Sequence, residues 1–261
     1  MTYNDYILKI PTVCRTKHIV RKDLCMKRCI IITGYIEGSI ASICPELLSP
    51  LSPGEKPPLI LCADGGYRLA KAEGLLPHVI IGDFDTFDDQ SGEQPGVCDS
   101  AYGRGTVIRV PVMKDDSDTM LCIKYGLDQG CDSFLLIGGI GGRLDHTVAN
   151  LQSLAYLASR GADACMKDGE NCIMMKAPGS FSLFRCGGDD PDDTSRPYRR
   201  FSLFSWTPSC EGIFVSGAKY PLENGRLEFT FPLGVSNEFI DREARIRFQS
   251  GMMLVILNRH R

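Results

Sequence analysis

The residues best suited to chemistry in this sequence of 261 residues are aspartates and glycines gathered in four short clusters. Several carboxylates brought close together repel one another and cannot all stay ionised unless a cation binds among them. Aspartate oxygens suit a hard ion, and Mg²⁺ commonly takes one or two carboxylates together with phosphate oxygens and water. The clusters therefore predict a site for a magnesium–polyphosphate substrate. They are ADGG at 63–66, GDFDT at 82–86, KDDSDT at 114–119 and GGIGGRLDH at 138–146.

The glycines of the first and fourth clusters fit the phosphate part of this prediction. Gly65, Gly66, Gly141 and Gly142 would let backbone N–H groups approach phosphate oxygens with no side chain in the way. Arg143 adds a fork-shaped guanidinium that suits a phosphate.

Each cluster also has a plainer explanation when it is taken alone. An Asp-Gly-Gly sequence is typical of a turn, and acids before a helix favour its N-terminus electrostatically. Asp83 and Asp85 would then be exposed loop acids, and the glycines at 138–142 a flexible linker. His146 would be a capping or core histidine. The functional interpretation depends on the coincidence of four such clusters at four successive strand ends.

The elements that must position these clusters alternate between strand and helix. Short, continuously apolar runs are typical of strands covered on both faces, so they predict a mostly parallel sheet flanked by helices. In an open sheet of this kind the carboxyl ends of the strands line one crevice, and we expect the clusters to converge there. The predicted strands are 29–33, 59–63, 78–82, 106–110 and 133–139, and the predicted helices are 67–73, 117–129 with Ser117 as N-cap, and 145–160, which Gly161 ends.

A second kind of pattern begins after Gly161, where no long helical pattern returns. Short β-like runs separated by Gly, Pro and Ser predict an antiparallel β-sandwich or barrel. Asn224-Gly225 predicts a two-residue hairpin within it. The predicted organisation is an N-terminal extension at 1–25, an α/β domain at 26–165 and a β domain at 166–261.

Composition excludes several classes of protein. With 43% apolar and 23% charged residues and a net charge of −3, the chain has no basic excess for holding nucleic acid. The twelve cysteines include no CxxC pair, which disfavours a zinc site and favours reduced thiols. The apolar run at 29–33 is too short for a membrane span or a signal peptide, so we expect no membrane partner and a cytoplasmic location. Neither GxxxxGK[ST] nor a complete GxGxxG fingerprint occurs, which disfavours a P-loop kinase and a Rossmann dehydrogenase.

At these clusters the sequence resembles the thiamine pyrophosphokinases of bacteria, in order from about Met26 to the C-terminus. The resemblance implies an N-terminal α/β catalytic domain, a C-terminal β domain and a homodimer. It also implies pyrophosphoryl transfer from ATP to thiamine, giving thiamine diphosphate and AMP, with Mg²⁺ as cofactor. Two positions differ from the usual family sequence: Thr86 stands where serine is usual, and Ser117 stands where threonine is usual. The matching segments are 63–70, 81–86, 114–127, 138–154 and 234–240.

The resemblance also implies roles for individual residues. Asp83, Asp85 and Asp118 match the acids that bind metal in the family. The chemistry of phosphoryl transfer, rather than the resemblance, makes Asp115 or Asp145 a candidate acceptor for the alcohol proton. Ser236 and Asn237 match its thiamine-binding pair. The residues that match its nucleotide-binding stretches are Asp64, Gly65, Gly66, Gly141, Gly142 and Arg143, with Asp145 beside them.

Three other functions stay open at this point. The acceptor alcohol could be a different one, such as a pterin, because the ATP half would look alike. The chain could also be a nucleotide-binding module without turnover, or a metal-dependent phosphohydrolase. The pair Ser236-Asn237 favours thiamine, and the complete set of acids disfavours a module without turnover.

Overall fold

The computed structural model describes residues 27–48, 56–84, 98–100, 103–110, 116–185 and 198–259. The chain divides into two compact units, and the division falls after Gly169. The first is an α/β unit and the second, from Glu170, is a β unit. Thus the predicted fold class is confirmed: helices and a mostly parallel sheet come first, and antiparallel strands follow.

The α/β unit is built on a sheet in the order β7-β6-β1-β2-β3-β5-β4. All of its pairs are parallel except that of the edge strand β4 with β5. The central strands are almost wholly buried, which explains why their sequences are continuously apolar. The strands are β1 (Arg28–Ile32), β2 (Leu59–Ala63), β3 (Val79–Gly82), β4 (Cys98–Ser100), β5 (Gly103–Arg109), β6 (Ser133–Ile137) and β7 (Asp163–Lys167).

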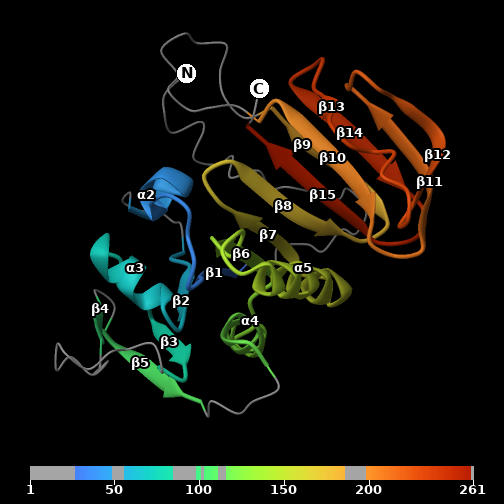
Figure 1. Ribbon diagram of the computed structural model, residues 1–261. Coiled ribbons are helices and arrows are strands. Elements are labelled where there is room, and N and C mark those ends of the chain that lie inside the picture. The colour runs from blue at the N-terminus through green and yellow to red at the C-terminus, as the bar shows by residue number, and fades with distance from the viewer. Residues whose placement is uncertain are drawn as a thin grey trace, which may run out of the picture. The chain divides into compact units, whose positions relative to one another are not determined.

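Helices cover both faces of this sheet, with α2 and α3 on one face and α4 and α5 on the other (Figure 1). Alternate residues of β1 therefore meet different helices. Ile30 and Ile32 belong to the core cluster that includes Ala70 of α3, whereas Cys29 contacts Gly126 of α4. The helices are α2 (Ile40–Ile43), the 3₁₀ helix η1 (Pro45–Leu48), α3 (Gly66–Ala72), α4 (Asp118–Asp128) and α5 (Leu144–Ser159).

The predicted helix ends agree with the structure to within one residue. Ser117 caps α4, and its Oγ accepts a hydrogen bond from the N–H of Met120 at 3.2 Å. Gly161, with φ +74°, follows the C-cap of α5. The prediction missed α2, because four residues are too few to show a helical period.

The strands of the β unit pair antiparallel in two sets of four, in the orders β13-β10-β15-β8 and β12-β11-β14-β9. Along β14, Ala244, Ile246 and Phe248 are buried and alternate with less buried residues, as expected for a sheet with one face against a core. The strands are β8 (Asn171–Lys176), β9 (Gly179–Phe184), β10 (Arg200–Ser205), β11 (Ser209–Ser216), β12 (Leu222–Glu228), β13 (Asn237–Glu238), β14 (Glu243–Phe248) and β15 (Met253–Asn258).

The hairpin predicted at Asn224-Gly225 is wrong. Both residues lie inside β12, which pairs with β11 on either side of them through Leu222 and Leu227. The register shifts between these pairs, and Asn224 has φ +52°. A left-handed residue followed by glycine can serve a β-bulge as well as a turn, and here it serves an irregularity within one strand.

Candidate active site

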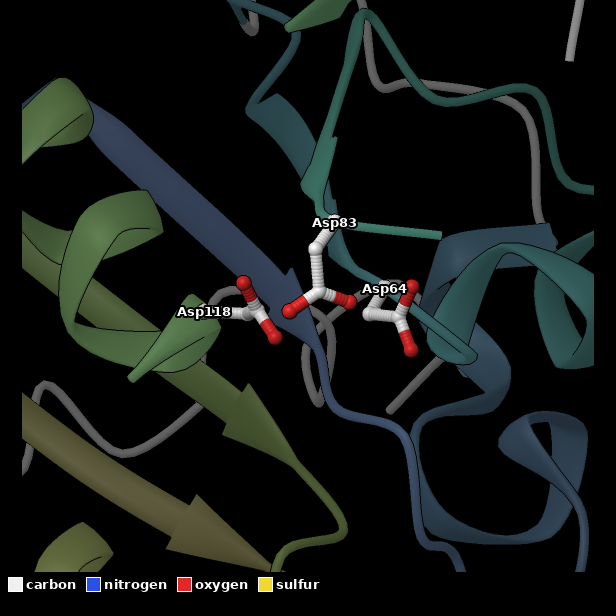
Figure 2. A group of neighbouring side chains, drawn as sticks. All are labelled: Asp64, Asp83 and Asp118. Carbon is white, nitrogen blue, oxygen red and sulfur yellow. The ribbon is translucent and has the colours of Figure 1, made fainter. Parts of the chain in front are cut away.

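Three carboxylates meet at the carboxyl ends of β2 and β3 and the start of α4. Asp64, Asp83 and Asp118 each offer one oxygen, and these three oxygens lie within 4.8 Å of one another. Figure 2 shows the three side chains next to one another, with the Asp83 carboxylate between Asp118 and Asp64. We call these three carboxylates the acidic group. The expectation that distant loops bring these aspartates together is therefore confirmed.

Asp64 is held in place by the backbone around it. Its φ is +39°, a left-handed conformation that aspartate tolerates better than most residues. Its N–H donates to the carbonyl of Ile81 at 2.8 Å, which ties it to β3. A Cβ atom on Gly82 would lie 2.9 Å from the Cα, Cβ and Oδ1 atoms of Asp64. Gly82 is therefore the residue that lets the Asp64 side chain lie against the end of β3.

Asp118 takes its position from the start of a helix. It is the first residue of α4, directly after the Ser117 cap. The partial positive charge at a helix N-terminus favours an ionised carboxylate there. The Oδ1 atoms of Asp118 and Asp64 are almost fully buried, so water screens the repulsion within the acidic group poorly.

Two thiols lie close to the acidic group. Burial, the Cys62 thiol and the Asp118 carboxylate raise the pKa of the Cys122 thiol well above its usual value. Cys122 therefore stays a neutral thiol, and a thiolate is what soft metals bind. The donors available for an ion are carboxylate oxygens, and this donor set fits a hard divalent cation such as Mg²⁺.

The glycines at 138–142 form a tightly fixed turn rather than a flexible linker. Gly138 has φ +81°, and an added Cβ would lie 2.3 Å from the carbonyl oxygen of Tyr35. Gly139 donates to that same oxygen at 2.8 Å and accepts from the side chain of Asn150 at 2.9 Å. Gly141 donates to Thr147 Oγ1 at 3.1 Å. These bonds hold the turn against the start of α5.

Tyr35 is a residue that the sequence analysis missed. Its ring covers the glycine turn so closely that a Cβ on Gly142 would lie 3.0 Å from the ring, and one on Gly141 would lie 3.3 Å from it. The side chain is 44% exposed, which leaves part of the ring accessible to solvent. No spacing in the sequence links a tyrosine after the first strand to glycines a hundred residues later.

Close packing requires glycine at position 66 but not at position 65. A Cβ on Gly66 would lie 2.2 Å from the carbonyl oxygen of Ile32, so α3 can approach the end of β1 only because residue 66 is glycine. Gly65, the N-cap of α3, has φ −56° and would make only ordinary contacts through an added Cβ. Of the two glycines, Gly65 is the one whose presence packing does not explain.

Arg143 and Asp145 form an exposed ion pair at the start of α5. Two bonds join them, Nη2 to Oδ2 at 2.6 Å and Nε to Oδ1 at 3.2 Å. The bonded guanidinium lowers the pKa of the Asp145 carboxyl, and the carboxylate raises the pKa of Arg143. A lowered pKa weakens Asp145 as a proton acceptor. Among the described acids, the close group of three does not include Asp145.

Ser236 and Asn237 lie in the β unit, at the start of β13. Ser236 has φ +59°, and its N–H donates to Ser202 Oγ at 3.0 Å. The Asn237 side chain makes two bonds to the backbone of Tyr220, accepting at 3.0 Å and donating at 2.8 Å. Asn237 thus fixes the loop that carries Tyr220, whose side chain is exposed.

Two of the predicted site residues, Asp85 and Asp115, lie outside the described residues. Their roles as metal ligand and proton acceptor stay predictions. Among the described residues, none of the helices is long and apolar enough to cross a membrane.

Comparisons with known proteins point to one family across both units. The family model described as "Thiamin pyrophosphokinase, catalytic domain" matches residues 54–166. A second family model, "Thiamin pyrophosphokinase, vitamin B1 binding domain", matches residues 192–253. The thiamine pyrophosphokinase of Bacillus subtilis is 27% identical over 183 residues, which cover 70% of this chain and 79% of that protein. A relative from Caenorhabditis elegans, thiamin pyrophosphokinase 1, is 23% identical over 186 residues, 69% of this chain and 70% of that protein.

Solved structures with these names share the fold. The crystal structure of the Bacillus subtilis thiamine pyrophosphokinase has a TM-score of 0.70 at 23% identity, covering 90% of this chain and 100% of that one. The thiamin pyrophosphokinase of Candida albicans has a TM-score of 0.68 at 16% identity, covering 90% of each chain. At these identities the likeness establishes the fold.

Proposed function

Because the chain belongs to the thiamin pyrophosphokinase family, we propose that it transfers pyrophosphate from Mg²⁺-ATP to the hydroxyl oxygen of thiamine, giving thiamine diphosphate and AMP. The observation that carries the ATP and magnesium parts is the acidic group, with three carboxylate oxygens within 4.8 Å. A cation bound among these oxygens would offset the repulsion between the carboxylates, and the transferred group of this reaction arrives with one.

In the proposed reaction the thiamine oxygen attacks the β-phosphorus in line, the bond from that phosphorus to the bridging oxygen of AMP breaks, and AMP leaves. Bound Mg²⁺ would neutralise charge on the phosphates during transfer. Asp83 and Asp118, with Asp64 beside them, would hold the ion, and Asp85 is a fourth candidate ligand. These residues act by positioning and electrostatics, which supply most of the acceleration in phosphoryl transfer.

The start of α5 and the turn before it are proposed to hold the ATP phosphates. The backbone N–H of Gly142 and the guanidinium of Arg143 offer donors there, beside a helix N-terminus that favours an anion, while the N–H of Gly141 donates to Thr147 Oγ1 and shapes the turn. The Arg143–Asp145 pair supports Asp145 as the group that orients Arg143, because its lowered pKa opposes proton acceptance. This leaves Asp115, of the two candidates, to take the alcohol proton.

The β unit is proposed to bind thiamine through Ser236 and Asn237. In support, the family model for vitamin B1 binding covers both positions. The left-handed φ of Ser236 and the two bonds from Asn237 to Tyr220 hold this segment in a defined shape. A preformed shape lowers the entropy lost when a ligand binds.

A single assay tests the proposal against its alternatives. The protein is incubated with Mg²⁺-ATP, with and without thiamine or a pterin alcohol, and AMP and thiamine diphosphate are measured. Formation of AMP and thiamine diphosphate only when thiamine is present supports the proposal. AMP formation without an acceptor would indicate a phosphohydrolase, pterin-dependent AMP a different acceptor, and ATP binding without AMP a module that does not turn over.

The exposed apolar residues of the β unit support a homodimer. Phe229, Phe231, Leu233 and Val235 are every second residue of the segment between β12 and β13, which contains turns at 229–230 and 233–234, and they are between 47% and 64% exposed. Ile240, 64% exposed, follows a few residues later. A row of large apolar side chains in water is unfavourable unless a partner covers it. We propose that a second copy of this chain does so.

The cysteines support a reducing compartment. Eight of the described cysteines form no disulfide bond, and of these seven are buried and Cys165 is partly buried. Reduced thiols in such number are typical of the cytoplasm, where we propose that the protein acts.

A further inference from the structure

The residue between Asp83 and Asp85 has an unusual backbone and a buried ring. Phe84 has φ +60°, a left-handed conformation that is a genuine outlier for a bulky residue that is not glycine. Such strain persists only where the surroundings hold it in place, and it gathers at functional sites. The surroundings of Phe84 therefore indicate what the strain serves.

Packing holds the Phe84 ring on the face of the sheet that α2 and α3 cover. The side chain is 6% exposed and belongs to the core cluster with Ile80, Ala70 and Leu75. On β5, the strand beside β3, the guanidinium carbon of Arg109 lies 5.2 Å from the centre of the ring. The cationic guanidinium is attracted to the ring face and covers it.

These contacts fix the backbone of Asp83 from both sides. On one side Gly82 ends β3, and its carbonyl accepts from Val110 N–H at 3.1 Å. On the other side the anchored Phe84 fixes the peptide that follows Asp83. Asp83 thus has little freedom to turn its carboxylate away from Asp64 and Asp118, although the three charges repel one another.

We infer that Phe84 is a positioning residue: its buried ring, covered by Arg109, clamps Asp83 so that the acidic group is preformed for a divalent cation. This inference rests on the proposed function, because it assumes that the acidic group binds a metal. It goes beyond it by assigning the affinity for the metal partly to a residue that offers no ligand atom.

The test measures binding of Mn²⁺ alone to the full-length protein, by the EPR signal of the free ion. We expect Phe84→Ala to raise the Mn²⁺ dissociation constant about tenfold or more, the range seen when groups that orient metal ligands are removed. Asp83→Asn serves as the reference for loss of a ligand. Turnover of Phe84→Ala should recover at high Mg²⁺, which a general loss of structure would not allow.

Leu75→Ala is the matched control, because Leu75 is 5% exposed and packs in the same cluster but lies outside the acidic segment. It should lower the melting temperature as Phe84→Ala does and leave the Mn²⁺ dissociation constant unchanged. A Phe84→Ala protein that loses stability and binds Mn²⁺ like the wild type would overturn the inference. If the wild type itself binds no Mn²⁺, the metal part of the proposed function fails and the inference fails with it.

A second variant keeps the test decisive if Phe84→Ala does not fold. Arg109→Lys keeps the positive charge and removes the planar guanidinium from an exposed position. We expect it to raise the Mn²⁺ dissociation constant by up to about fivefold, because the flexible lysine ammonium covers the ring face less completely than the planar guanidinium and the whole contact at an exposed site is worth about two- to fivefold. A folded Arg109→Lys protein with wild-type Mn²⁺ affinity would count against the clamp.

Discussion

The two units of this chain place their candidate functional side chains in opposite environments, one partly buried and the other exposed. In the α/β unit the acidic group is partly buried, and close backbone contact with Gly82 fixes Asp64 within it. In the β unit the segment around Ser236 carries a row of exposed apolar side chains. The three carboxylates of the acidic group come from one chain, whereas the second region exposes apolar side chains that the described residues of one chain leave uncovered. We therefore expect changes of charge to affect metal binding and turnover through the first unit. Changes of apolar surface should affect self-association through the second.

The largest effect is expected from Asp118→Asn, which removes one charge from the acidic group. Turnover should fall about 10²- to 10³-fold, as for loss of one group that stabilises transferred charge. The melting temperature in EDTA should stay level or rise, because repulsion within the acidic group is relieved. The stabilisation by added Mg²⁺ should disappear. Turnover assays and thermal melts with and without Mg²⁺ measure these effects, and wild-type turnover would remove Asp118 from the site.

The next effect separates two neighbouring glycines of the α/β unit. Gly66→Ala should lower the free energy of unfolding by about 3 kcal/mol, because its Cβ would meet the Ile32 carbonyl. Gly65→Ala should change it by less than about 1 kcal/mol, since its φ suits alanine. Urea denaturation measures both. If Gly65 meets the ATP phosphates as proposed, Gly65→Ala should still raise the KM for ATP, and an unchanged KM would remove that role.

The β unit gives a smaller effect, on association rather than on folding. Phe231→Ser should raise the dissociation constant of the homodimer about tenfold or more, as for a large apolar side chain near the centre of an interface. Phe184→Ser, on β9, is the control, because that side chain is 41% exposed but lies outside the apolar row. Light scattering over a dilution series measures the dissociation constant. Equal dimerisation of both variants would place the interface elsewhere.

The smallest effect concerns pH and lies in the α/β unit away from the acidic group. Burial lowers the pKa of His78 below its ordinary value of 6.5, and its Nδ1 accepts from the N–H of Ile60 at 3.0 Å. As the pH falls below 6.5, His78 therefore binds a proton in the unfolded chain before it does so in the folded chain. This contribution to stability is present above pH 6.5 and is lost as the pH falls through the folded-state pKa. Thermal melts between pH 7 and pH 5 should show the loss, and His78→Gln, which keeps an acceptor without titrating, should reduce it.

Much of the fold could be predicted because its signals are local. Continuous apolar runs, the Ser117 cap and Gly161 each depend on a few neighbouring residues, and the structure agrees with them. The prediction at Asn224-Gly225 failed because the local signal is ambiguous. A left-handed residue followed by glycine suits a bulge as well as a turn. Only the pairing of β11 with β12 on both sides of these residues decides between the two.

For the candidate site, too, the local features could be predicted and the long-range ones could not. The sequence by itself determined that aspartates follow the strands and that parallel strands bring them to one edge, since this follows from the direction of the chain. Only the tertiary structure decided that Asp64, Asp83 and Asp118 form the close group, that Asp145 pairs with Arg143, and that Tyr35 and Phe84 hold the loops in place. Those relations join residues far apart in the chain, or depend on which way a side chain turns. Distances of that kind are set by packing, and no spacing along a sequence encodes them.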